Sequence, residues 1–248
     1  MNRLKACFRL LGPILLAGCA SVTAAQSPAP DRSASKPAPS QKRPEHLPAG
    51  LWKKLQAVDR KAEKIENLQA KFVQEKHTLL LKKPLVSTGS IVQIGRRVLI
   101  RTDRPRPSVV AMDAKRIRMY YPKDKVLEVY PMHRAAGRLA AWPMLRPAQM
   151  ADRFHIEPLP ADPQPDLLAL RLKPRHKPLS ERIEKIDVRI DPNRGVLTYL
   201  EIHEVDGDRT VMKLSDIRIN QKLKDEAVEL NVPEQVRVIR PAEDKNQK

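Results

Sequence analysis

The stretch from Arg182 to Asn220 constrains the fold of this chain most strongly, because it encodes three strands in close succession. Apolar Ile186, Val188 and Ile190 alternate with polar residues, which is the period of a sheet with one covered face. Two turn sequences rich in Asp, Asn, Pro and Gly separate the strands. The stretch therefore predicts an antiparallel meander, and such a sheet must cover its apolar face with another element.

An amphipathic helix is predicted over Leu51–Gln69, ahead of the strands. Its apolar residues recur at helical spacing and are Leu51, Leu55, Val58, Ala62, Ile65 and Leu68. Charged residues, including Asp59 and Glu63, are expected on the opposite face. A helix of this length is long enough to lie across a sheet.

Alternating or β-branched segments predict further strands between this helix and the meander, and one after it. They are Ala70–Leu81, Val86–Ile94, Arg97–Thr102, Ser108–Met112, Arg116–Tyr121, Lys125–Tyr130, Arg153–Glu157, Asp166–Leu172 and an edge strand within Glu229–Ile239. No segment requires a parallel βαβ unit, so the expected class is antiparallel α+β. About eleven strands are expected to curl into a barrel or half-barrel.

An irregular apolar insert, His133–Gln149, interrupts the β pattern. Leu139, Trp142 and Leu145 are spaced for one side of a short helix, which prolines in the insert would break into pieces. Two interpretations stay open at this point. The insert is either a lid over the sheet or an ordinary packed connection.

The first eighteen residues have the layout of a secretory signal, with a basic start and the short apolar run Leu10–Ala17. The run ends in Leu-Ala-Gly-Cys19, which resembles the lipobox of bacterial lipoproteins and implies acylation of Cys19. An ordinary signal peptide that happens to contain a cysteine is the alternative. Since Cys7 lies within the signal, Cys19 would remain alone, and no disulfide could form within one mature chain.

These features divide the chain into four expected parts. They are a signal peptide (1–18), a lipidated N-terminus with a Pro- and Ser-rich disordered linker (19–48), a folded domain (49–240) and a tail (241–248). Ala20 follows the cysteine, which in the enterobacterial pattern resembles a protein sorted to the outer membrane. We therefore expect an anchor on the periplasmic face of that membrane, with the inner membrane as the alternative.

The formal net charge of +18 raises the question of a nucleic-acid partner. Two features argue against a nucleic-acid partner. The chain is expected to be exported, and its basic residues are spread along strands without interleaved aromatics. Anionic lipid headgroups are a better match for this charge, because basic groups gain free energy near an anionic surface. A basic but merely solvated surface explains the charge equally well.

No enzymatic centre is expected. The six histidines lack metal-ligand spacing, no Gly-rich phosphate loop occurs, and neither a metal nor a cofactor is predicted. The densest polar cluster is Glu201–Glu204, followed by Asp206 and Asp208. Strand alternation separates Ile202 from its polar neighbours, and Asp206 is needed for the turn, so we do not expect catalysis there.

Several dispersed motifs follow one another in a recognisable order. They are Ile65–Gln74, Ser87–Ile91, Arg101–Pro105, Met119–Pro122, Asp206–Asp208, Asp216–Asn220 and Val232–Pro233. In this order they resemble the outer-membrane lipoprotein carrier family, which contains the soluble carrier LolA and its membrane-anchored counterpart LolB. The lipobox and linker look more like the anchored member.

The resemblance implies an incomplete antiparallel barrel with an N-terminal helix and a helical lid. Its apolar cavity would hold the acyl chains of lipoproteins or other lipids, in a monomer that is not an enzyme. The expected lining residues are Phe72, Leu80, Ile91, Leu99, Leu139, Trp142, Leu145, Val188 and Leu200. Arg101 matches the arginine that holds the lid in the soluble carrier, although Thr102 stands where an aromatic residue is usual.

Two other functions stay open. An anchored envelope sensor or assembly factor of the same fold would bind a protein or lipopolysaccharide instead of an acyl chain. A carrier of a different lipid, such as a hopanoid or phospholipid, would share the cavity but not the client.

Overall fold

The computed structural model describes residues 42–131, 145–159, 164–177 and 179–240. The strands are β1 (Asn67–His77), β2 (Leu85–Ile94), β3 (Arg97–Arg104), β4 (Ser108–Met112), β5 (Arg116–Tyr121), β6 (Val126–Pro131), β7 (Phe154–Pro158), β8 (Leu168–Pro174), β9 (Ile183–Asp191), β10 (Val196–Glu204), β11 (Arg209–Ile219) and β12 (Arg237–Ile239). The helices are α2 (Ala49–Ala62), α4 (Pro147–Met150) and the 3-10 helix η3 (Asp225–Val228). None of the described helices has the length and apolar character needed to cross a bilayer.

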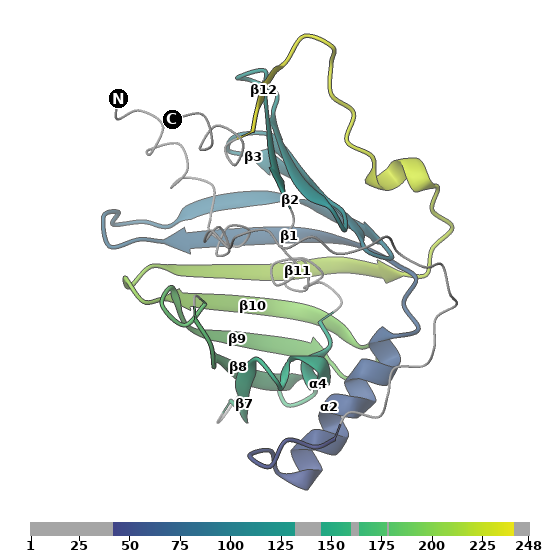
Figure 1. Ribbon diagram of the computed structural model, residues 1–248, viewed down its shortest axis with the longest axis vertical. Coiled ribbons are helices and arrows are strands. Elements are labelled where there is room, and N and C mark those ends of the chain that lie inside the picture. Colours follow the sequence, from purple (N-terminus) through teal and green to yellow (C-terminus); the bar gives the residue numbers. More distant parts are fainter. Residues whose placement is uncertain (1–41, 132–144, 160–163, 178, 241–248) are drawn as a thin grey trace, which may run out of the picture.

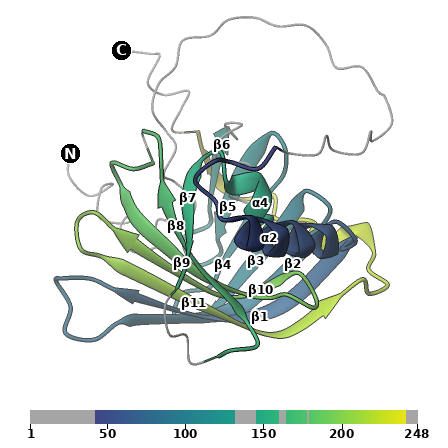
Figure 2. The ribbon, with the colours of Figure 1, turned by 90° about the horizontal axis from the view of Figure 1, so that it is seen from below.

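All twelve strands form one sheet in the order β12-β6-β5-β4-β3-β2-β1-β11-β10-β9-β8-β7. Neighbours pair antiparallel except β12, which runs parallel to β6. The sheet is strongly curved and stays open between its edge strands β12 and β7, and α2 lies within its concave side (Figures 1 and 2). The expected half-barrel with an N-terminal helix is confirmed, with twelve strands where about eleven were predicted.

The main core lies between the concave face and α2. The helix contributes Leu51, Trp52, Leu55 and Val58, and every strand from β1 to β11 contributes at least one buried apolar residue. We call this concave, apolar side of the sheet the inner face. A smaller cluster on the outer face packs Leu99 and neighbouring side chains against Val228 of η3.

The helix ends earlier than its apolar period predicts, at Ala62 and not at Gln69. Side-chain amides fix this boundary. Asn220 accepts a hydrogen bond from the Glu66 amide at 2.8 Å and donates one to the Lys64 carbonyl at 3.0 Å. These bonds tie the turn after α2 to the end of β11, so the backbone must leave the helix and enter β1.

The first strand also ends earlier than predicted, at His77 and not at Leu81. Residues 78–84 form the turn that joins β1 to β2. An alternating pattern does not show where strand pairing stops. The predicted strand therefore continued into this apolar turn.

The turn between β9 and β10 packs against the end of α2 at Gly195. This residue has φ +71°, and a Cβ there would lie 2.6 Å from the Ala62 nitrogen and 2.8 Å from the Lys61 Cβ. Glycine is therefore required for two reasons, its left-handed backbone and the approach of the helix.

We expect Gly195→Ala to lower the free energy of unfolding by about 2–4 kcal/mol, through backbone strain plus the clash with α2. Gly95→Ala is the matched control, because Gly95 has φ +56° but nothing within 4 Å of an added Cβ. The control should lose only the backbone part, about 1 kcal/mol. If urea unfolding shows the same loss of unfolding free energy in both variants, the turn does not pack tightly against the helix.

Candidate ligand-binding face

The inner face brings together five of the residues predicted to line a cavity. Phe72, Ile91, Val188 and Leu200 lie on β1, β2, β9 and β10, and Leu145 precedes α4. All five are buried in the main core cluster. They are covered by side chains of the protein itself, so the described residues form a filled interior.

The other predicted site residues lie elsewhere. Leu80 is 89% exposed in the β1–β2 turn, because β1 ends before it. Leu99 is buried on the outer face against η3, since three apolar residues in a row conceal which side of β3 faces inward. Leu139 and Trp142 lie outside the described residues.

Arg101 is exposed on β3, two residues from Leu99 and therefore on the outer face by strand alternation. Within the described residues no hydrogen bond or ion pair involves its side chain. The insert that it was predicted to hold lies largely at 132–144, outside the described residues. The position of Arg101 gives no support to a latch.

A different residue joins the helices that cover the inner face. Asp59 of α2 is buried, not exposed as the helical pattern suggested. Its two carboxylate oxygens accept hydrogen bonds from the backbone amides of Ala148 and Gln149 in α4, each at 3.2 Å. A half-exposed ion pair between Arg146 and Glu63, also 3.2 Å long, lies beside them. We call Asp59 and these partners the α2–α4 latch.

Burial raises the pKa of Asp59 to about 6, although both backbone hydrogen bonds and Arg146 act to lower it. Desolvation thus disfavours the charged carboxylate more than its hydrogen bonds and Arg146 stabilise it. A sequence signal existed, because position 59 lies one turn beyond Leu55 and three residues before Ala62, both on the buried side.

A buried ion network closes the inner face at the opposite end from α2. Lys76 of β1 points inward and is 6% exposed. Its ammonium group lies 3.2 Å from Glu204 and 3.3 Å from Asp208, at the two ends of the β10–β11 turn. Desolvation raises the pKa of Glu204 although Lys76 lowers it. The network joins the β1–β2 and β10–β11 hairpins.

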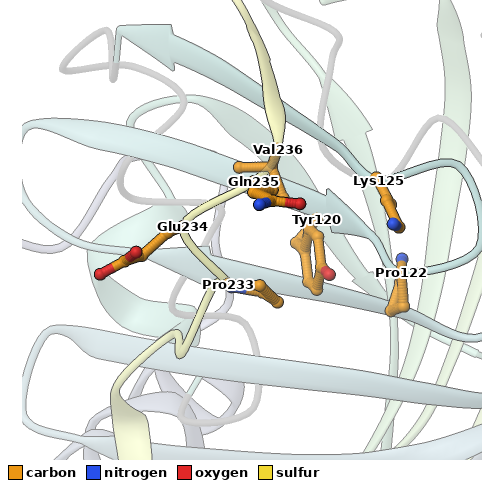
Figure 3. Close-up of a pocket in the computed structure, with 7 residues that line it drawn as sticks. All are labelled: Tyr120, Pro122, Lys125, Pro233, Glu234, Gln235 and Val236. Atoms are coloured by element: carbon orange, nitrogen blue, oxygen red, sulfur yellow. The ribbon is translucent and has the colours of Figure 1, made fainter.

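Two of the hollows on the described surface are open to solvent. One, of about 260 Å³, lies beside α2 and is lined by Val58, Leu168 and neighbouring residues. The other, of about 390 Å³, lies where the C-terminal segment meets β5 and β6, beside Tyr120 and Val236 (Figure 3). Ligand sites usually enclose about 300–1,000 Å³ and bury most of the ligand, so neither hollow is a finished acyl cavity.

One group of side chains has the composition of a metal site. Ligand atoms of Asp187, Glu201 and His203 lie within 4.8 Å of one another on the outer face. However, Arg171 donates two hydrogen bonds to Asp187, at 2.7 and 2.6 Å, and Arg209 donates one to Glu201 at 3.0 Å. The arginines already neutralise the carboxylates, so the geometry favours an ion-pair network over a metal ion.

Comparison with known proteins agrees with this architecture. The family model of the outer membrane lipoprotein carrier protein LolA matches residues 63–230, more than half of the chain. No curated protein matches the chain.

The chain is also similar to solved structures at low sequence identity. An uncharacterized conserved protein from Thermus thermophilus matches with a TM-score of 0.50 and 11% identity, over 77% of this chain and 99% of that one. The MucA/MucB complex from Pseudomonas aeruginosa matches with a TM-score of 0.44 and 13% identity, over 74% of this chain and 62% of that one. A putative outer membrane lipoprotein-sorting protein domain from Vibrio parahaemolyticus matches with a TM-score of 0.43 and 11% identity, over 72% of this chain and 95% of that one.

The α2–α4 latch predicts a pH dependence of stability. The pKa of Asp59 is about 6 in the folded protein against an ordinary value of 3.8, so its protonation favours the folded state. This contribution is complete below pH about 4 and is lost as pH rises through about 6, and it amounts to about 3 kcal/mol. Urea unfolding should show it in the wild type and not in Asp59→Asn.

Glu63→Gln serves as the control, because it removes only the half-exposed ion pair with Arg146. We expect it to change the free energy of unfolding by about 0.5 kcal/mol or less and to keep the pH dependence. An Asp59→Asn protein with the wild-type profile would contradict a buried, titrating carboxylate.

Proposed function

The chain belongs to the LolA family of outer membrane lipoprotein carrier proteins, and from this premise we propose that it binds acyl chains of lipoproteins or other lipids against its inner face. Members of this family are carrier proteins of the bacterial envelope, not enzymes. The apolar inner face is the observation that carries the proposal. It runs across β1–β11, and within the described residues the helices α2 and α4 cover it.

The described structure corresponds in this proposal to the closed state. Leu51, Trp52, Leu55 and Val58 of α2 occupy the space that an acyl chain would take. Binding then requires α2 to move outward together with α4, to which Asp59 joins it. The small hollow between α2 and β8 marks the seam at which that movement would begin.

Magnitudes make this exchange reasonable. A fourteen-carbon acyl chain gains about 11 kcal/mol on leaving water, at about 0.8 kcal/mol per CH₂ group. Exposing the four apolar α2 side chains costs about 8 kcal/mol, at about 2 kcal/mol each. A single chain of this length can therefore replace the helix, whereas a short one cannot.

We propose further that the protein is tethered to a membrane through acylated Cys19, with residues 19–48 as a flexible linker and 1–18 removed as a signal peptide. These residues up to 41 lie outside the described ones. The tether would keep the carrier near the membrane in which it delivers or collects its client. The outer membrane is the expected site, since Ala20 follows the cysteine.

Two matched leucines test whether a ligand competes with α2. Leu55 on α2 and Leu99 on the outer face are both 1% exposed or less. Each substitution by alanine should destabilise the protein by about 2–5 kcal/mol. Only Leu55→Ala removes a competitor for the acyl chain, so it should raise the affinity for a fluorescent fatty acid severalfold while Leu99→Ala leaves it unchanged.

The client itself is identified by organic extraction and mass spectrometry of protein that lacks residues 1–19. An acyl-containing lipid or lipopeptide is expected. Retention of a periplasmic protein after crosslinking, with no lipid extracted and no fatty acid bound by any variant, would contradict the proposal. That result would favour an envelope sensor or assembly factor of the same fold.

A further inference from the structure

Two neighbouring hairpins end in apolar residues that nothing in the described structure covers. The β1–β2 turn carries Leu79, Leu80 and Leu81, of which Leu80 is 89% exposed. The β10–β11 turn carries Val205, which is 59% exposed. Consecutive exposed leucines are costly in water, and a protein surface that gathers them usually has a partner. We call these four residues the hairpin tip.

The hairpin tip is one continuous structure and not two loose loops. β1 pairs with β11 up to His77 and Arg209, so the two turns emerge side by side. A Cβ built on Gly207 would lie 3.2 Å from Leu79, which shows that the turns touch. Beneath them, Lys76 binds both Glu204 and Asp208 in the buried network described above.

We propose that the hairpin tip inserts into the interface of an anionic lipid bilayer. Its shape favours a fluid surface over a protein groove, because both turns project past the ends of the neighbouring strands (Figure 1). A convex tip with side chains this exposed needs a partner that can close around it. The headgroup and upper acyl region of a bilayer does so without a preformed pocket.

The charge of the hairpin tip fits the same partner. Lys82 and Lys83 follow the leucines directly, are exposed, and have no ionic partner among the described residues. Asp206 is the one exposed acid of the adjoining turn, while Glu204 and Asp208 are less exposed and share the single ammonium group of Lys76. When leucines enter the apolar layer, two lysines beside them reach the level of anionic headgroups.

Insertion would set the orientation of the whole domain. In Figures 1 and 2 the hairpin tip lies at the left, while α2 and the end of β11 lie towards the right. The inner face would then stand upright on the membrane, with Lys76 near the lipid and α2 away from it. This placement needs neither the acyl cavity nor the anchor at Cys19.

Residues 42–240 contain all described helices and strands and their core, so this segment is suitable for the test. It also lacks the leader and Cys19, which would bind membranes by themselves. We expect it to sediment with vesicles of phosphatidylglycerol and phosphatidylcholine. Leu80→Ser/Leu81→Ser should weaken this binding about tenfold or more, whereas Leu79 and its contact with Gly207 remain.

Val73→Ser/Val238→Ser is the matched control, because both valines are exposed, at 38% and 42%, but lie outside the hairpin tip. It should bind vesicles as the wild type does. Lys82→Gln/Lys83→Gln should weaken binding about tenfold at low salt and leave binding to pure phosphatidylcholine unchanged.

A fluorophore gives a direct measure of insertion. Both cysteines of the chain precede residue 42, so Leu80→Cys supplies a unique attachment point. An environment-sensitive dye there should shift to the blue on adding vesicles, whereas the same dye on Val238→Cys should not.

Three results would overturn the proposal. The first is that the segment binds neither the mixed nor the pure phosphatidylcholine vesicles. The second is that Leu80→Ser/Leu81→Ser binds vesicles as tightly as the wild type. The third is that the protein is a dimer in which the dye on Leu80→Cys is shielded without lipid. The last would assign the hairpin tip to a second copy of the chain. A failure to bind fatty acid would instead count only against the proposed function.

Discussion

One physical constraint governs this protein: a long curved sheet with an apolar concave side must exclude water from that side. The sheet cannot do this alone, because it stays open between β12 and β7. The covering helix supplies large side chains, Trp52 and Leu55 among them, and is joined to α4 through a buried carboxylate. Desolvation raises the pKa of that carboxylate, so burial disfavours its charged form despite the hydrogen bonds that it accepts. The proposed binding of acyl chains requires that this cover be removable.

Most of the sheet could be predicted from the sequence, and the reasons are local. Ser108–Met112 and Arg116–Tyr121 have the predicted boundaries because turn residues flank both strands. The helix end was wrong because Ile65 and Leu68 continue the apolar period, while the bonds from Asn220 that stop it come from more than 150 residues away. No local pattern contains that information.

The candidate site was predicted only where alternation was unambiguous. Phe72, Val188 and Leu200 lie on strands with one apolar side, and all three are buried in the core on the inner face. Val98, Leu99 and Ile100 are all buried, since η3 covers the outer side of β3, and a sequence cannot show which of three apolar neighbours faces inward. Asp59 was missed because acidic residues are assigned to the solvent side of a helix by default.

The open edges of the sheet have a mechanical consequence. In a closed barrel, strand number and shear fix the radius, so widening the interior would require hydrogen-bonded ladders to break. Here β7 and β12 have no strand between them, and β12 is held to β6 over only three residue pairs. The curvature can relax by small changes of twist between successive strands while every ladder stays intact. If the inner face binds acyl chains as we propose, the capacity of the interior would be elastic, and one scaffold would accommodate chains of different girth.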